Sequence, residues 1–174
     1  VQLDWMVREC LSRNDGAIHY IRAYRKNVTE VYEPGTKFEL GKGKVLIPGD
    51  EVLLVGSGYL MGDALTAAEE LRAQGISVEV VDPVTIKPFD EELILNETKG
   101  KKLVVTYENH GTVNGIGSAV ADVLAKNGAG VPLLKLGATE IFGQVGMVDL
   151  LKEAYKLTAK DAVAEILKAW HKVN

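Results

Sequence analysis

From residue 51 onward, short apolar runs alternate with longer amphipathic segments. The apolar runs have the length of buried strands, and the segments between them repeat hydrophobic residues at helical spacing. Strands that alternate with helices form a parallel sheet, because each crossover places a helix on one face of the sheet. We therefore expect an α/β fold. Its strands are expected at 43–48, 51–58, 77–83, 102–109 and 131–137, and its helices at 60–75, 88–100, 115–128, 147–157 and 158–172.

The expected helix ends carry residues that stabilise helix termini. Asp90 is placed to cap the helix that follows it. Thr158 precedes Asp161 by three residues, which is the spacing of a capping box. Gly75 follows the last periodic residue of its helix, where glycine readily adopts the left-handed conformation that ends helices. These signals support the boundaries of three of the helices.

The first residues also have helical periodicity, because apolar side chains within 3–11 recur on one face. That face needs a partner surface, and the chain starts at Val1 without a methionine, so we expect a fragment of a larger protein. After a turn at 14–16, β-branched and aromatic residues at 17–24 predict a strand. We interpret 27–36, which contains a Pro–Gly dipeptide, as a linker. The apolar face of the first helix consists of Leu3, Met6, Val7, Cys10 and Leu11.

The overall composition excludes several classes of function. The chain has 174 residues, of which 47% are hydrophobic, and a net charge of −4 with both signs spread along it. Without a basic block, a nucleic-acid partner is not expected. The apolar runs are too short to span a membrane. The single cysteine, Cys10, has no partner for an internal disulfide, and a cytoplasmic protein is the default expectation.

A glycine-rich turn follows the strand at 51–58. Gly56, Gly58 and Gly62 form GxGxxxG, close to the GxGxxG turn of dinucleotide-binding proteins, and Asp82 ends the next strand, where an acid would bind ribose. A tight turn from strand to helix needs glycine for steric reasons alone. The spacing has one residue more than the dinucleotide pattern, so we favour a structural turn and keep nucleotide binding as the alternative.

Two further groups lie near the expected end of the strand at 102–109. Glu108 and His110 could act as an acid–base pair at this edge of the sheet. The alternative, which we favour, is that they form loop hydrogen bonds and cap the next helix. Gly115 and Gly117 could expose backbone N–H groups to an anion, although no lysine follows as it does in a P-loop.

Three cations lie at the end of the predicted strand at 17–24. A guanidinium from Arg22 or Arg25, with Lys26 beside them, is suited to holding a phosphate group. A solvated cluster of charges is the alternative. No metal site is predicted, because the chain has no cluster of cysteine and histidine; the histidines, His19, His110 and His171, are scattered.

Several stretches together resemble the C-terminal part of transketolase and its thiamine-diphosphate relatives. They are "VLLVGSGYLMGDALTAAEELRAQGISVEVVDPVTIKPFDEE", "TYENHGTVNGIGSAVADVLAKNG" and "LKLGATEIFGQVGMVDLLKEAYKLTAKDAVAEILK", in which "TIKPFD" and "FGQVG" are the most specific. The resemblance runs from about Lys37 to Lys168. "AIHYIRAYRKN" is similar to the closing strand of the family's pyrimidine-binding domain. The resemblance therefore implies the tail of that domain at 1–26, a linker at 27–36 and a C-terminal domain at 37–174.

The resemblance also implies a fold and a reaction. The fold is a three-layer αβα sandwich around a five-stranded, mostly parallel sheet with one antiparallel strand. The reaction transfers a two-carbon ketol unit between phosphorylated sugars of the pentose phosphate type, with thiamine diphosphate and a divalent metal (Mg²⁺) in the full enzyme. The family's metal-binding GDG turn does not occur here, and the glutamate that activates the cofactor would lie upstream of Val1. We therefore expect no cofactor in this chain alone, and no activity.

The resemblance assigns few site residues within the chain. Arg25 matches an arginine that contacts the substrate phosphate in the family, and Arg22 is the neighbouring alternative. His110 and the turn at 115–117 are expected to pack between domains or subunits. Asp82 is expected to be a strand-end residue. The expected partners are the remaining transketolase domains or an N-terminal subunit, in a homodimer or a heterotetramer.

Four alternatives stay open at this stage. Two are close relatives: a 2-oxo-acid dehydrogenase E1 β subunit and a deoxyxylulose-phosphate synthase. The "FGQVG" stretch and the final capped helix favour transketolase or the synthase over the dehydrogenase. The third is a free-standing Rossmann-like dinucleotide-binding module, and the fourth is a module that serves interaction only.

Overall fold

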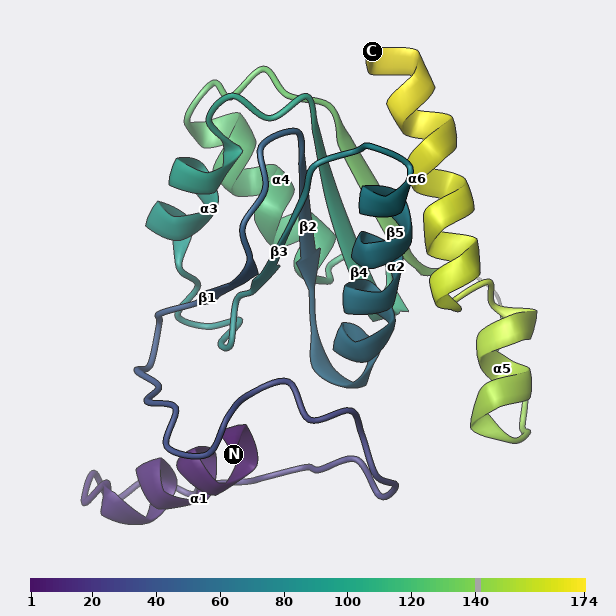
Figure 1. Ribbon diagram of the computed structural model, residues 1–174. Coiled ribbons are helices and arrows are strands. Elements are labelled where there is room, and N and C mark those ends of the chain that lie inside the picture. Colours follow the sequence, from purple (N-terminus) through teal and green to yellow (C-terminus); the bar gives the residue numbers. More distant parts are fainter. Residues whose placement is uncertain (140–141) are drawn as a thin grey trace.

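The computed structural model describes residues 1–139 and 142–174. At its centre is a five-stranded sheet in the order β1-β3-β2-β4-β5, with helices on both sides (Figure 1). The strands are β1 (Lys44–Ile47), β2 (Val52–Gly56), β3 (Val78–Asp82), β4 (Leu103–Gly111) and β5 (Leu133–Ala138). The helices are α1 (Gln2–Ser12), the 3-10 turn η1 (Gly58–Leu60), α2 (Met61–Ala73), α3 (Glu91–Thr98), α4 (Ile116–Lys126), α5 (Val148–Ala154) and α6 (Ala159–Val173).

The sheet is mixed. Strands β2 to β5 run parallel to their neighbours, whereas β1 runs antiparallel to β3 at one edge, with Val45 opposite Val81. The short connection from β1 to β2 explains the reversal, because parallel strands need a long crossover between them. The carboxyl ends of β2, β3 and β4 therefore lie together at one edge, which we call the carboxyl edge. The mixed five-stranded sheet confirms the expected fold class.

Each face of the sheet has its own hydrophobic core. Along β2, Val52 and Leu54 point to the core under α2 and α6, while Leu53 and Val55 point to the core under α3 and α4. All four side chains are fully buried. A strand buried on both faces has to be apolar at every position. This is why the sequence shows continuous apolar runs rather than alternation, and the three layers are confirmed (Figure 1).

The predicted helix ends are also confirmed. The Asp90 carboxylate accepts a hydrogen bond from the Leu93 N–H at the start of α3. Thr158 and Asp161 form a reciprocal capping box at the start of α6. Gly75 follows α2 with a φ of +86°, in the left-handed region that favours glycine.

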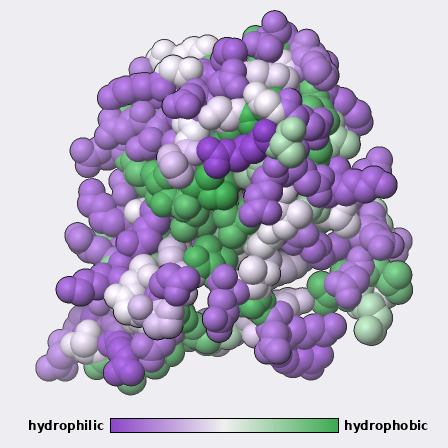
Figure 2. All heavy atoms as spheres, viewed as in Figure 1, coloured by the Kyte–Doolittle hydropathy of each residue, from purple (hydrophilic) through white to green (hydrophobic). Residues whose placement is uncertain are grey.

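The N-terminal segment differs from its prediction in one respect. Helix α1 forms as expected, but residues 17–24 form no strand. A strand needs a neighbour to pair its backbone groups, and this segment crosses below the sheet rather than along β1 or β5 (Figure 1). None of the residues of α1 is buried, and hydrophobic side chains reach the surface over this helix (Figure 2). In the described part of the chain, no helix is long and apolar enough to cross a membrane.

Candidate functional site at the carboxyl edge

A cavity of about 760 Å³ lies between the N-terminal segment and the carboxyl edge of the sheet. Open α/β sheets generally bind ligands at this edge, because loops and helix N-termini converge there. We call it the carboxyl-edge cavity. Its walls include Arg22, Tyr24 and Lys26 from the N-terminal segment, and Gly58, Tyr59 and Asp82 from the ends of β2 and β3.

Aromatic contacts attach the N-terminal segment to this edge. The rings of Tyr24 and Tyr59 are stacked, with centroids 4.9 Å apart and planes 9° from parallel. The Tyr32 hydroxyl donates a hydrogen bond of 2.6 Å to the Asp82 carboxylate. Phe38 packs edge-on against Tyr32, with centroids 4.8 Å apart. These contacts fix one wall of the cavity against the sheet.

The predicted cations lie in different places around this cavity. Arg22 and Lys26 belong to its lining, whereas Arg25 is exposed on the same segment and outside the lining. Among the described residues, neither arginine forms an ion pair, in contrast to Arg8 and Arg13 of the same segment. The two guanidinium groups are therefore available to an anionic ligand.

The glycine-rich turn makes its contacts with the chain itself. Gly58 has a φ of +58°, which explains glycine at this position. A Cβ atom on Gly56 would come within 3.2 Å of Met61 and Ala64, so glycine there lets β2 and α2 approach closely. A side chain on Gly62 would collide with Thr29 of the N-terminal segment. These contacts support the structural interpretation of the turn over nucleotide binding.

Asp82 is occupied by internal hydrogen bonds. Its two carboxylate oxygens accept from the Tyr32 hydroxyl and, at 2.8 Å, from the Val84 N–H. Burial raises the pKa of the Asp82 carboxyl, and these two hydrogen bonds only partly oppose that effect. An acid that binds ribose would need free oxygens, so Asp82 serves to attach the N-terminal segment. The expectation of a strand-end residue is confirmed.

Glu108 caps a helix rather than acting with His110. Its side chain is 1% exposed, and its oxygens accept hydrogen bonds from the N–H groups of Ile116 (2.8 Å) and Gly117 (2.9 Å). These are the donors that could have bound an external anion at the start of α4. A Cβ atom on Gly115 would overlap the Glu108 carboxylate. The interpretation of Glu108 as a helix cap is therefore confirmed. His110 is exposed at the end of β4, apart from the buried Glu108 carboxylate, so the two do not form an acid–base pair.

Comparison with known proteins agrees with this architecture. The family model described as "Transketolase, C-terminal domain" matches residues 41–162. The chain belongs to the transketolase C-terminal domain family. A solved structure described as "Split gene transketolase, inactive beta4 tetramer" superposes on this chain with a TM-score of 0.81 and is 40% identical to it in sequence. The match covers 86% of this chain and 49% of the chain in that structure.

Two curated relatives show the range of reactions in the family. The "6-deoxy-6-sulfo-D-fructose transketolase subunit SqwH" of Clostridium sp. (strain MSTE9) is 42% identical over 92% of this chain and 48% of its own length. The "1-deoxy-D-xylulose-5-phosphate synthase" of Heliobacterium modesticaldum is 34% identical over 92% of this chain and 25% of its own length. The chain thus spans about half the length of the first relative and a quarter of the second.

The candidate metal ligands of this transketolase domain are dispersed in the part of the chain that the structure describes. Among residues 1–139 and 142–174, no three or more His, Cys, Asp or Glu side chains come together in a group that could hold a metal ion. The N–H groups at the start of α4 are taken by Glu108. No step of the reaction is therefore assigned to cofactor-binding residues of this chain.

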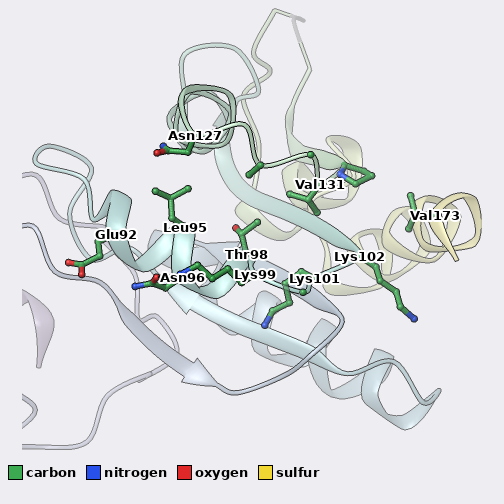
Figure 3. A pocket seen from close by; sticks show the side chains of 14 residues that line it. Glu92, Leu95, Asn96, Thr98, Lys99, Lys101, Lys102, Asn127, Val131 and Val173 are labelled. Carbon is green, nitrogen blue, oxygen red and sulfur yellow. Dashed lines mark hydrogen bonds between the residues drawn. The ribbon is translucent and has the colours of Figure 1, made fainter.

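A second hollow, of about 950 Å³, lies at the opposite edge of the sheet. Leu95, Asn127 and Val131 face one another across it, whereas Lys101 and Lys102 extend away (Figure 3). The Lys101 ammonium donates to the Gly49 carbonyl, and the Lys102 ammonium donates to the side chains of Glu51 and Asn174. These two cations stabilise the fold, so neither Lys101 nor Lys102 is free to bind an anion in this hollow.

Sequence reasoning missed the aromatic residues that attach the N-terminal segment. Tyr32 falls within the segment interpreted as a linker, and Tyr24 within the predicted strand. A solvated linker is poor in aromatic residues, so Tyr32, followed by Phe38, was the available signal that this segment packs against the domain.

Proposed function

We propose that this chain is the C-terminal part of a thiamine-diphosphate-dependent transketolase, which transfers a two-carbon ketol unit between phosphorylated sugars in the pentose phosphate metabolism of the cytoplasm. The observation that carries the proposal is the match to the transketolase C-terminal domain, together with the identity to a transketolase subunit. In this proposal, residues 1–26 are the last part of the pyrimidine-binding domain. Residues 27–36 are the linker, and residues 37–174 form the C-terminal domain.

The remaining domains, or an N-terminal subunit, hold thiamine diphosphate and Mg²⁺ in this proposal. The described residues contain no group of three or more His, Cys, Asp or Glu side chains that could hold a metal ion, and the related solved structure is described as an inactive tetramer of a split-gene transketolase. The cofactor supplies the electron sink that stabilises the carbanion formed when the ketose is cleaved. This chain contributes substrate binding and assembly, and has no activity alone.

Arg25 and Arg22 bind the phosphate end of the sugar. Both guanidinium groups are free of ion pairs among the described residues, and Arg22 lines the carboxyl-edge cavity. A planar guanidinium donates two parallel hydrogen bonds to a tetrahedral oxyanion. Lys26 lies in the same lining and adds a positive charge, which favours a dianion.

A sulfonated sugar is a second candidate substrate. The relative at 42% identity is named for a sulfonated fructose. Sulfonate and phosphate are both tetrahedral oxyanions, so the same arginines could hold either group. Paired assays with a phosphorylated and a sulfonated ketose would separate them, and a higher kcat/KM for the sulfonate would identify the second substrate class.

Assembly with a partner is the other proposed role. Helix α1 exposes Leu3, Met6 and Val7, and the segment around α5 exposes Phe142 and Leu150. Hydrophobic side chains reach the surface over both helices (Figure 2). Exposed apolar patches of this kind mark protein interfaces. We expect the chain to bury them in a homodimer or a heterotetramer with the remaining transketolase domains.

The test compares the isolated chain with the complete enzyme, whether that is one longer polypeptide or this chain with an N-terminal subunit. Each sample receives thiamine diphosphate, Mg²⁺, a ketose phosphate and an aldose phosphate, and its mass is measured by sedimentation. Ketol transfer is expected only in the complete enzyme. Transfer by the isolated chain, or no transfer by the complete enzyme, would refute the proposal.

A deoxyxylulose-phosphate synthase is the second candidate function, because such a synthase is 34% identical to this chain. A 2-oxo-acid dehydrogenase E1 β subunit is the weaker alternative. A transketolase moves its ketol unit without gas release, whereas a thiamine enzyme that acts on a 2-oxo acid releases CO₂ from it. CO₂ release from pyruvate by the complete enzyme, without ketol transfer from a ketose phosphate, would favour these alternatives.

A further inference from the structure

Tyr24 is the aromatic contact nearest in sequence to the two arginines. It lies two residues after Arg22 and one residue before Arg25, and its ring is stacked on Tyr59 at 4.9 Å. Residues 17–24 have no regular secondary structure. In this chain, which spans about half the length of its relatives, the stack is a side-chain contact that joins this stretch to the carboxyl edge of the sheet.

Tyr59 is well suited to be the fixed partner in this stack. It lies in η1, between Gly58 and the fully buried Leu60. Its own ring is partly buried and packs against the core under α2 and α6. Tyr24, in contrast, is 42% exposed and is not among the described residues that form the two cores or pack against them. The glycine-rich turn thus presents an anchored aromatic ring at the carboxyl-edge cavity.

Two other attachments of the segment lie farther along the chain, and a third joins Trp5 of α1 to Phe38. Thr29 packs against Gly62, and Tyr32 donates to Asp82. Both lie on the C-terminal side of Arg25, separated from it by several residues of irregular backbone. They attach the segment as a whole, whereas the stack lies next to the arginines in the sequence.

We propose that Tyr59 is a positioning residue for substrate binding, which through its stack with Tyr24 holds the stretch that carries Arg22 and Arg25 against the carboxyl edge of the sheet. This role rests on the proposed contact of the two arginines with the anionic end of the sugar. The glycine-rich turn then has a function besides connecting strand to helix, because it supplies the ring on which the substrate-binding segment rests.

The test uses the complete enzyme with Tyr59→Ala, Tyr59→Phe, Arg25→Ala and Arg22→Ala, and the double variants of Tyr59→Ala with each arginine. Leu167→Ala is the matched control, because Leu167 packs partly buried against the same core from α6. Steady-state kinetics are measured with a ketose phosphate and with the same ketose lacking phosphate. Inorganic phosphate serves as a competitive inhibitor that reports the anion contact without chemistry.

Tyr59→Ala is expected to raise KM for the ketose phosphate and the inhibition constant of inorganic phosphate about two- to tenfold, the range of a lost aromatic stack. We expect kcat and the constants for the unphosphorylated ketose to stay as in the wild type. Tyr59→Phe keeps the stack and is expected to behave like the wild type, as is Leu167→Ala. In the arginine variants, Tyr59→Ala is expected to have a smaller effect than in the wild type, because it acts through the arginines.

The possible failures are distinguishable. If the arginine variants raise KM but Tyr59→Ala does not, the positioning role is refuted and the proposed substrate contact stands. If no arginine variant changes the constants for phosphate, both proposals fall. Should Tyr59→Ala not fold, Tyr24→Ala removes the same stack from its exposed side. A raised KM for the ketose phosphate in Tyr24→Ala would then support the positioning role, and an unchanged KM would refute it.

Discussion

The Glu108 carboxylate accepts a hydrogen bond of 2.8 Å from the N–H of Ile116, eight residues ahead in the chain. A second bond, from the Gly117 N–H, is 2.9 Å long. The end of β4 thereby caps the start of α4 with a buried negative charge, at the end of the helix where the macrodipole favours an anion. The strand and the helix on either side of this loop are held in one arrangement.

Glu108→Ala is expected to destabilise the chain by about 3 kcal/mol, because two buried N–H groups lose charged acceptors. Glu108→Gln keeps one acceptor oxygen and is expected to cost about half as much. Urea unfolding of the chain measures both. Glu165→Ala, which removes a glutamate of α6 whose side chain is 43% exposed and paired with Lys168, is the control. Equal, small losses for Glu108→Ala and Glu165→Ala would contradict the capping role.

The buried Asp82 carboxyl should make stability depend on pH. Burial raises its pKa above the ordinary value of 3.8, so between that value and the raised pKa the folded chain binds more protons than the unfolded chain. Stability from this group therefore falls as the pH rises through that interval. Asp82→Asn removes the effect, and the free energy of unfolding of Asp82→Asn relative to wild type is expected to increase with pH there.

Each unit by which the pKa of Asp82 is raised corresponds to about 1.4 kcal/mol in this difference. Urea unfolding from pH 4 upward measures it, and Asp122→Asn controls for the loss of an exposed carboxylate. A difference between Asp82→Asn and wild type that stays constant or decreases with pH would show that burial does not raise the pKa of this group.

The buried pair of Glu79 and Lys101 supports the amino edge of the sheet. Their side chains are 5% and 7% exposed, with 3.3 Å between Nζ and Oε2, while Glu79 Oε1 has no hydrogen-bond partner. Burial raises the pKa of Glu79, and Lys101 opposes this effect. The ammonium also donates to the Gly49 carbonyl at 2.8 Å, so it serves both groups.

Lys101→Met is expected to destabilise the chain by about 3 kcal/mol at pH 7, because it leaves a buried carboxylate without its partner. Adding Glu79→Leu should recover most of the loss, since an apolar pair often replaces a buried ion pair at little cost. Urea unfolding of the single and double variants tests this. Lys168→Ala, which removes an exposed pair with Glu165, is the control. If the double variant lost as much free energy of unfolding as the two single variants together, the result would contradict the account.

The layers of the fold could be predicted because they follow from local patterns. The apolar run that includes Val52–Val55 requires burial on both faces, and the caps at Asp90 and Thr158 use neighbouring residues only. The strand predicted at 17–24 failed for the opposite reason. Its residues have strand propensity, but a strand also requires a paired neighbour, and that depends on the rest of the molecule.

The candidate site was harder to predict, because its contacts join residues far apart in the sequence. The Glu108 cap was foreseen as an alternative, since it connects nearby residues. The stack of Tyr24 on Tyr59 and the bond from Tyr32 to Asp82 span 35 and 50 residues, as the difference of their numbers shows. The aromatic residues of the segment indicate that it packs against the domain, but the local pattern does not show which residues they contact.

The most direct test of the account measures selectivity for the phosphorylated substrate in the complete enzyme. The quantity is the ratio of kcat/KM for a ketose phosphate to kcat/KM for the same ketose without phosphate. For Arg25→Ala we predict that this ratio falls about tenfold or more, as expected for the loss of a charge-assisted contact, with a fall in the same direction for Arg22→Ala. Arg13→Ala, which removes an arginine paired with Glu9, should leave the ratio unchanged. Unchanged ratios in both Arg25→Ala and Arg22→Ala would contradict the account.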